Sequence, residues 1–537
     1  MTNLHGKQIL IAATLIGLSM LLTGNLWGVI ETSEARYAEI SREMYRSGDW
    51  LHPRLLNIHH YHKPPVTYWF TAIAYSLFGV NAFAARFFLV LSFGLQVFLL
   101  YQIAKLLFRS ENVASYSALV YATLPLVLVS ARGLTTDSYL TTFVLLSLFC
   151  GIRFFESKNV FFLYGMALSL GLGFLVKGPV IFIVPVLAMV GMRPPWTSVK
   201  LWQALSALAM FVAVGFSWFA ILVVEDSRFA DYFFFRHFVD RLTKAEVFAR
   251  EKPWYFYLPI IPMVTIPWIT FFVGGILAKK SFDGDLGIAK RIILWWILFP
   301  LIIFSISSSK LVLYILPLSI GFSLATGYYL AQGIPRTLFT ISAGLVVVIN
   351  ICLVVVSIFY PQLNIDNTLV VSSSAALAVS LGIWLLNLSR EISVLFLGTL
   401  FATNLILFSS QFFNLNSNEV NSLKCVSSYI RQQGLQERAI IVYDELLPSI
   451  AFELDKEIIS VYAGDRSLKR ETQFEHDDRW RQNLIDATDR ARITYLQSIL
   501  SKKSVLIVKN EMPEQLDSLL TGTWYQKAFG KWKVLYN

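Results

Sequence analysis

The chain has 537 residues, of which 55% are hydrophobic and only 15% charged. Soluble domains carry about 25% charged residues, so these charges are too few to cover a globular protein of this size. The high apolar content also excludes intrinsic disorder over most of the length. Of the three cysteines, Cys150 and Cys352 lie inside apolar runs, which excludes a disulfide scaffold. The composition predicts a polytopic membrane protein.

The net charge is +10, from 45 basic and 35 acidic residues. The basic residues are spread through short loops between apolar segments, which is typical of membrane topology rather than of nucleic-acid binding. We therefore expect membrane lipids, and no nucleic acid, among the partners of this chain.

A helix needs about 20 apolar residues to cross a bilayer, and about 13 segments approach that length. The first follows Lys7 and is too long for the core of a signal peptide, so we expect an uncleaved first helix. The expected spans lie near residues 9–28, 83–107, 113–131, 138–156, 159–176, 178–193, 202–224, 255–278, 291–308, 311–331, 337–359, 369–388 and 392–412.

The distribution of lysine and arginine predicts the orientation, since cytoplasmic loops are enriched in both. With the N-terminus in the cytoplasm, the cytoplasmic loops hold basic residues such as Lys105 and Arg153, whereas the outer loop 360–368 has none. Two long outer loops, 29–82 and 225–254, are nevertheless basic, so their charge calls for a local explanation. An odd number of spans places the C-terminus outside.

The composition changes near residue 415. Residues 438–444, 457–462 and 504–509 resemble buried strands bounded by polar turns. Helical patterns near 419–434 and 484–502 alternate with them, which predicts a small soluble α/β domain. We therefore expect an all-α transmembrane domain over 1–414, with outer-face loops 29–82 and 225–254, and an outer α/β domain over 415–537.

The first outer loop begins with a predicted helix over residues 31–46. Ser33 suits its N-cap and Gly48 suits its end. The apolar side chains share one face, which predicts a helix lying on the membrane surface. The remaining surface would expose two i,i+3 ion pairs, Glu39 with Arg42 and Glu43 with Arg46.

Charged residues of this loop are candidates for chemistry. Glu31, Glu34 and Arg36 follow directly after the first span, where a cavity of the helix bundle would open. Lys63 precedes two prolines that impose an extended backbone, and aromatic residues surround it. Its compact ammonium suits a lipid-linked phosphate. The alternative is a lysine snorkelling from an aromatic belt.

Four of the seven histidines also fall within the loop, and clustered histidines suggest zinc. No known zinc-ligand spacing is satisfied, so an ordinary polar surface loop is the competing interpretation. The four are His52, His59, His60 and His62.

Three stretches, E-A-R-Y-A-E-I-S-R-E-M, S-G-D-W and H-K-P-P-V-T-Y-W, begin at Glu34, Ser47 and His62. They resemble the first periplasmic loop of the bacterial aminoarabinose (4-amino-4-deoxy-L-arabinose) transferases that modify lipid A. The wider group comprises lipid-carrier-dependent glycosyltransferases of the GT-C fold, related to protein O-mannosyltransferases. Further similar motifs are Thr136-Asp137, the lysine turn 174–179 and the segment 308–317.

The resemblance implies transfer of a sugar from undecaprenyl phosphate to lipid A at the periplasmic face of the inner membrane. Direct displacement at the anomeric carbon would invert its configuration. The lipid phosphate gains negative charge as it leaves, and positioned cations would stabilise it. Lys63 is the first candidate for binding it, and Arg36, Lys177, Lys310 and, through a hydrogen bond, Tyr314 are further candidates. The alternative for Lys177 and Lys310 is a lysine that snorkels from the bilayer.

Carboxylates are the candidates for general base catalysis. An acceptor hydroxyl would need a base, for which Glu34 is the best placed and Glu31 is the alternative. A lipid A phosphate is already anionic, in which case the carboxylates would position the amino sugar. Asp137, at the outer start of a span, is a third catalytic candidate, and an N-cap is its alternative role.

The chain departs from the family pattern at two positions. Asp-Glu is common before x-Arg-Tyr, whereas this chain has Ser33-Glu34. An acidic residue implicated in holding a metal often precedes Lys-Pro-Pro, whereas this chain has His62, for which a zinc bridge to His237 remains possible. In the same loop as His237, Arg236 and Arg241 could bind the acceptor, or could provide simple interfacial charge.

Two other functions remain open. A related enzyme would use the same donor with a protein or another glycan as acceptor. A lipid or solute transporter is the third hypothesis, but transporters commonly place broken helices and polar residues at the bilayer midplane. Here the polar residues lie in outer loops and at helix ends, which favours an enzyme.

Overall fold

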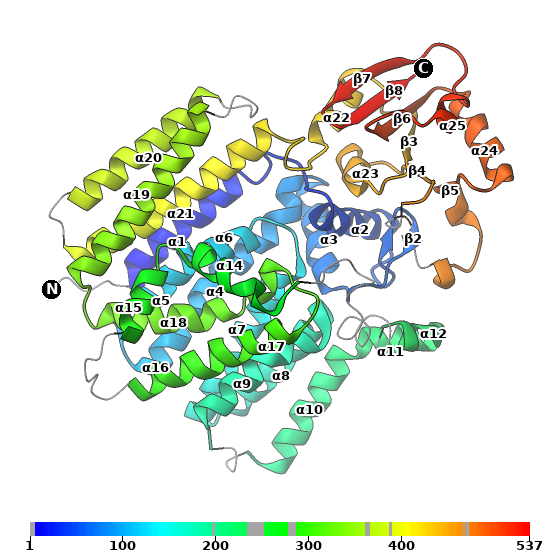
Figure 1. The fold of residues 1–537 in the computed structure, drawn as a ribbon. Coiled ribbons are helices and arrows are strands. Elements are labelled where there is room, and N and C mark those ends of the chain that lie inside the picture. The colour runs from blue at the N-terminus through cyan, green and yellow to red at the C-terminus, as the bar shows by residue number, and fades with distance from the viewer. Residues whose placement is uncertain are drawn as a thin grey trace. The chain divides into compact units, whose positions relative to one another are not determined.

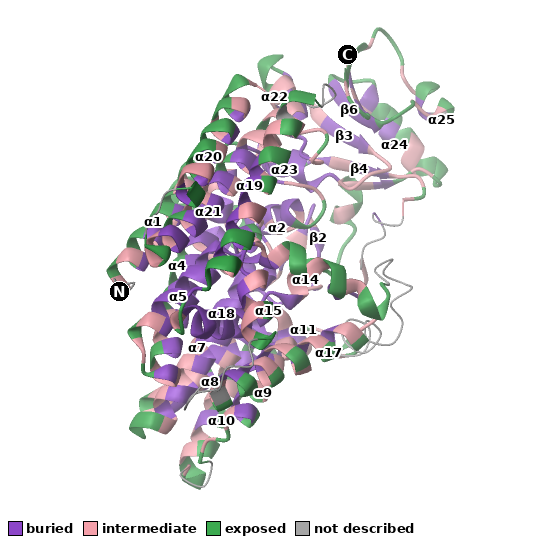
Figure 2. Ribbon diagram, turned by 60° about the vertical axis from the view of Figure 1, so that its left-hand side comes forward, coloured by how far each residue is buried: buried purple, intermediate pink, exposed green. Residues whose placement is uncertain are grey.

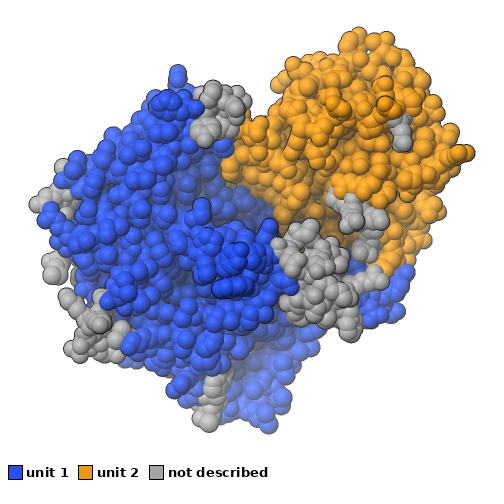
Figure 3. All heavy atoms as spheres, in the orientation of Figure 1, with its two compact units in different colours: residues 1–23, 89–412 blue, residues 24–88, 413–537 orange. Residues whose placement is uncertain are grey.

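The computed structural model describes residues 6–195, 199–233, 252–277, 286–359, 366–385, 389–465, 468 and 472–537. The chain forms two compact units (Figure 3). The first contains residues 1–23 and 89–412, and the second contains residues 24–88 and 413–537. Arg236, Arg241 and His237 lie outside the described residues.

The first unit is helical (Figure 1). Its elements begin with α1 (Gly6–Leu22), α4 (Ala82–Phe108), α5 (Glu111–Thr123), α6 (Pro125–Ser130), α7 (Thr136–Ser157), α8 (Val160–Lys177), η1 (Gly178–Phe182), α9 (Ile183–Met192), α10 (Leu201–Gly215), α11 (Ser217–Glu225) and α12 (Arg228–Ala230). They continue with η5 (Trp254–Phe256), α14 (Tyr257–Thr265), α15 (Ile269–Leu277), α16 (Leu286–Ile292), η6 (Ile293–Leu298), α17 (Phe299–Ile306), η7 (Val312–Ile315), α18 (Leu318–Ala331), α19 (Arg336–Phe359), α20 (Asn367–Leu385) and α21 (Arg390–Leu415).

The polytopic helical class is confirmed. Among the described residues, seven helices are long and apolar enough to cross a membrane, or up to nine if each of two bent pairs forms one span. About 13 were expected on length. Some expected segments are shorter as helices: α1 has 17 residues and α18 has 14. The expected spans 159–176 and 178–193 instead form one continuous candidate over 160–192.

Prolines explain two of these differences. Pro179 lies in the first turn of the 3-10 segment η1, a position that needs no backbone N–H, so the chain continues from α8 into α9. Leu124 precedes Pro125 and is extended, at φ −68° and ψ 127°. Because a residue before proline avoids the α region, the expected span 113–131 divides into α5 and α6.

The centre of the first unit is closely packed, and α5, α7 and α18 are largely buried (Figure 2). A Cβ atom placed on Gly327 of α18 would lie 2.2 Å from the Ser117 hydroxyl of α5, and 2.5 Å from its backbone nitrogen. Small residues permit this close approach, which is how helices pack where water supplies no hydrophobic driving force.

The second unit contains a six-stranded mixed sheet in the order β5-β4-β3-β6-β8-β7. Its first four strands are parallel, and β8 and β7 continue the sheet antiparallel. The predicted strands are confirmed as β3, β4 and β6, whereas residues 484–486 form β5 rather than the start of a helix. The elements are α22 (Lys424–Gln432), β3 (Ala439–Tyr443), α23 (Pro448–Leu454), β4 (Ile459–Tyr462), η9 (Thr472–Phe474), η10 (Arg479–Gln482), β5 (Leu484–Asp486), α24 (Arg490–Leu500), β6 (Ser504–Lys509), α25 (Glu514–Asp517), β7 (Tyr525–Phe529) and β8 (Trp532–Tyr536).

The first outer loop also belongs to the second unit, whereas the sequence boundary at 414/415 assigned it to the transmembrane domain. It forms α2 (Ser33–Ser47), the two-stranded pair β1 (Arg54–Leu55) and β2 (Ile58–His59), and α3 (Val66–Phe78). Ile40 and Met44 of α2 pack in one hydrophobic core with Ile440, Val442 and Val505 of the sheet. Hydrophobic burial therefore joins segments that lie about 400 residues or more apart in the sequence.

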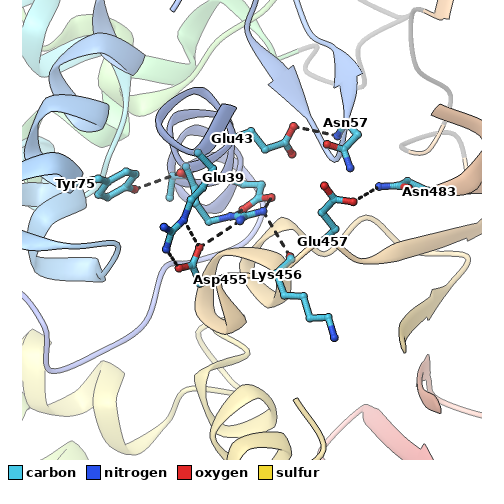
Figure 4. Close-up of polar contacts among 11 residues, drawn as sticks. Glu39, Glu43, Asn57, Tyr75, Asp455, Lys456, Glu457 and Asn483 are labelled. Atoms are coloured by element: carbon cyan, nitrogen blue, oxygen red, sulfur yellow. Dashed lines mark hydrogen bonds and ion pairs between the residues drawn. The ribbon is translucent and has the colours of Figure 1, made fainter. Parts of the chain in front are cut away.

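The prediction of an exposed surface for α2 was wrong. Glu39, Arg42 and Glu43 are buried, because α2 packs between α3 and α23. Arg42 does pair with Glu39, at 2.7 Å, but inside the fold (Figure 4). Arg46 pairs with Asp455 rather than with Glu43. An apolar face alone did not reveal that protein also covers the polar side of the helix.

Candidate functional site

Asp137 and Lys177 form a buried ion pair within the first unit. Asp137 lies in the first turn of α7 and Lys177 is the last residue of α8. The Lys177 Nζ atom donates to the Asp137 Oδ1 atom at 2.5 Å, and each side chain is only 9% exposed. A carboxylate in a first turn and an ammonium in a last turn both complement the helix dipoles.

Tyr314 completes this cluster from the 3-10 segment η7. The Lys177 Nζ atom lies 4.3 Å from the centre of the Tyr314 ring, which is a cation–π distance. Three residues that the sequence singled out separately therefore lie together. The Lys177 ammonium thus contacts a carboxylate and an aromatic ring, at a position where water screens its charge only weakly.

Lys310 is also buried, at 3% exposure. Its Nζ atom donates to the Lys252 carbonyl oxygen at 2.8 Å, and the Lys252 backbone N–H donates to the Ser308 carbonyl. The Tyr257 hydroxyl donates to the Leu311 carbonyl at 3.1 Å. These bonds tie the strandlike segment before η7 to the start of α14, and so they position Tyr314.

Glu34 forms a second buried ion pair, within the second unit. Its two carboxylate oxygens accept from Arg86 Nε and Nη2, at 2.8 and 3.0 Å, and the Ile30 backbone N–H donates to it at 3.0 Å. Arg86 also donates to the carbonyls of Gly24, Trp27 and Gly28, and it stacks over the Trp27 ring at 4.2 Å. These bonds from the guanidinium fix the conformation of the segment that precedes α2.

Arg86 was not singled out from the sequence. A signal was present, because it lies within an expected apolar span, where an ionisable residue is costly and needs a partner. The sequence alone does not indicate that this partner is Glu34.

Glu31 has a different environment from Glu34. Its Oε1 atom accepts from the Ser449 backbone N–H at 2.8 Å. Its Oε2 atom is buried and has no hydrogen-bond partner among the described residues. Burial raises the pKa of Glu31 from 4.5 to about 7, although the bonds from Ser449 and the charge of Arg36 oppose the rise. A carboxylate that titrates near neutral pH suits proton transfer.

Lys63 lies in the turn between β2 and α3 and is partly exposed. Pro65, the second of the two prolines after it, is the N-cap residue of α3, and α3 begins at Val66. Lys63 and Arg36 both belong to the second unit together with Glu31 and Glu34. Their roles in binding a phosphate stay predictions.

The histidines of the first loop have separate partners. The His59 Nδ1 atom lies 2.8 Å from Glu475, the His52 Nδ1 atom lies 2.9 Å from Asp49, and the His60 and His62 rings are 3.9 Å apart. No group of three or more metal-ligating side chains gathers among the described residues. Because His237 is not among them, zinc binding by His62 and His237 stays a prediction.

Buried polar contacts hold α2 in place (Figure 4). Arg42 donates to Asp455 at 3.3 Å, and Glu43 accepts from the Asn57 backbone N–H at 3.0 Å. Burial, and then the nearby charge of Glu39, raise the pKa of Glu43 to about 8. The hydroxyl of Tyr75 donates to the Ala38 carbonyl at 3.2 Å. The helix that carries Glu34 and Arg36 is therefore fixed along its length.

A family model described as dolichyl-phosphate-mannose-protein mannosyltransferase matches residues 62–219. The chain matches, at 32% identity over 325 residues, undecaprenyl phosphate-alpha-4-amino-4-deoxy-L-arabinose arabinosyl transferase 2 of Pseudomonas fluorescens. A transferase named alike from Serratia proteamaculans is 31% identical over 334 residues. Each match covers 59% of this chain and 58% of the relative's length.

The crystal structure of ArnT from Cupriavidus metallidurans bound to undecaprenyl phosphate matches with a TM-score of 0.78 at 20% identity. The match covers 98% of this chain and 97% of that one. The chain therefore has the ArnT fold. The apo structure of ArnT matches in the same way, with a TM-score of 0.75. Similarity to ArnT thus extends over both compact units, and it confirms a helical membrane protein that carries a mixed-sheet domain.

Proposed function

We propose that this protein is an inverting glycosyltransferase that moves 4-amino-4-deoxy-L-arabinose from undecaprenyl phosphate to lipid A. The observation that carries the proposal is the buried Lys177 ammonium beside Asp137 and Tyr314, where α8 passes into η1. The names of the relatives and the ligand of the ArnT crystal structure support the donor. The chain spans 58% of those relatives, so donor and acceptor alike belong to the proposal.

The proposed reaction is a single displacement. A phosphate oxygen of lipid A forms a bond to the anomeric carbon, the bond from that carbon to the undecaprenyl phosphate oxygen breaks, and the leaving phosphate keeps the electron pair. Its growing charge requires cations in place before the reaction, because such groups stabilise the transition state without reorganising. Lys177, Lys310, Lys63 and Arg36 are each a proposed candidate for such a cation, and Tyr314 is a proposed hydrogen-bond donor.

The carboxylates have different proposed roles. Because a lipid A phosphate is already ionised, this reaction needs no general base. Asp137 accepts a hydrogen bond from Lys177 and so orients its ammonium. Glu34 is paired with Arg86, so we propose that it positions the loop and that Glu31 faces the amino sugar or, with a hydroxyl acceptor, accepts its proton. The two arginines 236 and 241 remain candidates for binding the acceptor.

The proposed location is the bacterial inner membrane, with the N-terminus in the cytoplasm and the C-terminal domain in the periplasm. Seven to nine candidate spans in the described residues support a multi-pass protein. Cysteine accessibility tests the orientation: in a variant without the three native cysteines, a cysteine introduced at Ser518 of the C-terminal domain should react with a membrane-impermeant maleimide in intact spheroplasts. Labelling that occurs only after lysis would mean that the C-terminal domain lies in the cytoplasm, which is opposite to the proposed orientation.

Mass spectrometry of lipid A, from cells with and without the gene, tests the reaction. We expect lipid A carrying one or more aminopentose units only when the gene is present. Unchanged lipid A would refute this acceptor and would favour the second function, transfer from the same donor to a protein or another glycan, which the mannosyltransferase family match supports. Solute uptake that depends on the gene while every glycan stays unchanged would indicate a transporter.

Lys63→Ala is expected to remove nearly all transfer, by about 10²–10³-fold, if Lys63 contacts the donor phosphate. The measurement is the rate of aminoarabinose transfer by the purified protein. Lys503→Ala, at an exposed position between α24 and β6, serves as the control. Wild-type turnover by the Lys63 variant would refute its assignment.

The raised pKa of Glu31 predicts a pH-dependent stability. The folded state holds the proton up to about pH 7, whereas the unfolded chain releases it near 4.5, so stability falls as pH rises between these values. Glu31→Gln keeps an acceptor for the Ser449 N–H and removes the titration. We expect this variant to match the wild type in melting temperature at pH 5 and to exceed it at pH 8. If the difference in melting temperature between Glu31→Gln and the wild type is the same at pH 5 and pH 8, the raised pKa of Glu31 is contradicted.

A further inference from the structure

A cavity of about 380 Å³ lies in the second unit, and its lining contains none of the proposed transferase residues. Tyr462 and Asp486 are the last residues of the paired parallel strands β4 and β5, in register with each other. Asp489 and Arg492 come from the start of α24, and Trp480 and Arg481 come from η10. Crevices beyond the carboxyl ends of parallel strands are where open α/β sheets bind ligands. The volume falls within the range of small-molecule sites.

The polar side chains of this cavity are held in place, and they retain atoms that can form hydrogen bonds with a ligand. The Asp486 Oδ1 atom accepts from the backbone N–H and the hydroxyl of Thr488, and the Asp489 Oδ1 atom accepts from the Ala491 N–H. These capping bonds use one oxygen of each carboxylate. The Arg492 side chain makes no hydrogen bond or ion pair with any residue that the structure describes.

The aromatic side chains supply an apolar surface beside these charges. Trp480 is half-buried, and the Arg481 guanidinium lies 5.3 Å from the centre of its ring, while Arg481 also pairs with Asp478 at 3.0 Å. Tyr462 adds a second ring from the sheet. The two arginines and two aspartates in the lining cancel in charge, so the cavity does not favour a polyanion or a polycation.

We propose that this cavity binds a saccharide. Carboxylates and guanidinium groups are planar and can bond two adjacent hydroxyls at once. Aromatic rings offer large apolar faces, onto which the C–H face of a sugar ring can pack. A neutral ligand rich in hydroxyls matches a charge-balanced lining better than a nucleotide or free phosphate does. The inference does not rest on the proposed transferase function, because it concerns a separate site and any glycan could use it.

Saturation-transfer NMR on the full-length protein in detergent tests this site. The probes are methyl β-D-glucopyranoside and methyl β-D-glucosaminide, with inorganic phosphate and ADP as competitors. We expect a saturable signal from the ring C–H groups of at least one glycoside. Trp480→Ala and Arg492→Ala should each raise its Kd by about ten-fold or more, since each removes one main contact.

Two matched variants keep the test specific. Arg490→Ala changes the neighbouring turn of α24, and Arg479→Ala removes the residue beside Trp480 that pairs with Asp477. Neither residue lines the cavity, and both variants should bind like the wild type. The proposal is overturned if no glycoside gives a saturable signal, if all four variants behave alike, or if phosphate or ADP displaces the glycoside. Should Trp480→Ala fail to fold, Arg492→Ala decides.

Discussion

Lys177→Ala is expected to lower sugar transfer by about 10²–10³-fold, because it removes a preorganised cation from a buried site. The alanine also leaves the Asp137 carboxylate buried without its partner at 2.5 Å. Breaking a buried ion pair in this way costs about 3–5 kcal/mol of stability. A loss of activity in this variant alone would therefore not distinguish catalysis from unfolding.

A paired apolar replacement separates the two effects. Asp137→Leu with Lys177→Met removes both charges, and such exchanges are often neutral or stabilising. We expect this double variant to regain the thermal stability of the wild type and to remain inactive. Transfer rates and melting temperatures of the single and double variants are the measurements. An active double variant would show that the pair serves only the fold.

Lys158→Ala is the control for Lys177. Lys158 is exposed at the C-terminal end of α7, the helix that carries Asp137 at its other end. Lys158 lies 5.6 Å from the centre of the Phe155 ring, and removing this exposed lysine should leave the transfer rate unchanged and the melting temperature nearly so. A loss of activity as large as that of Lys177→Ala would mean that positive charge in general, and not the buried cluster, supports transfer.

Arg86→Ala is expected to be the most destabilising single change in the second unit, at about 3–5 kcal/mol. It would leave the Glu34 carboxylate buried without its partner, and it would also remove the donor to the carbonyls of Gly24, Trp27 and Gly28. Glu34→Ala should cost less, since Arg86 keeps these three acceptors. The order of the two melting temperatures is the measurement.

The matched control for Arg86 directly follows the other end of the same helix. Arg109 follows the other end of α4 and is exposed, so Arg109→Ala should change the melting temperature little. If Glu34→Ala destabilises the protein more than Arg86→Ala does, the carbonyl bonds contribute little. Equal and small effects in both variants would mean that the pair is not buried in solution.

Local patterns were sufficient for the fold class and for several elements. Long apolar runs predicted the membrane helices, and short runs of valine and isoleucine between polar turns predicted β3, β4 and β6. Gly48 does end α2, with a left-handed φ of 73°. These features depend on neighbouring residues, because hydrogen bonding and side-chain spacing within a helix or strand are set over a few positions.

Several site residues could also be named from motifs, namely Asp137, Lys177 and Tyr314. Their contact could not be predicted, because the three residues lie on different elements. No pattern in the intervening sequence indicates how close these elements lie in the fold. The same holds for Glu34, whose partner Arg86 lies 52 residues away. The sequence indicated the residue types that the chemistry needs, whereas the packing of the helices determines which of these residues contact each other.

The assignment of the first outer loop needed the three-dimensional fold most of all. Its helix α2 has one apolar face, which in isolation suits a membrane surface. In the structure that face lies in the core of the C-terminal sheet, and its charged side is covered as well. An amphipathic pattern reports only that a face is buried. Whether lipid or a distant segment buries it depends on which surfaces the whole chain brings together.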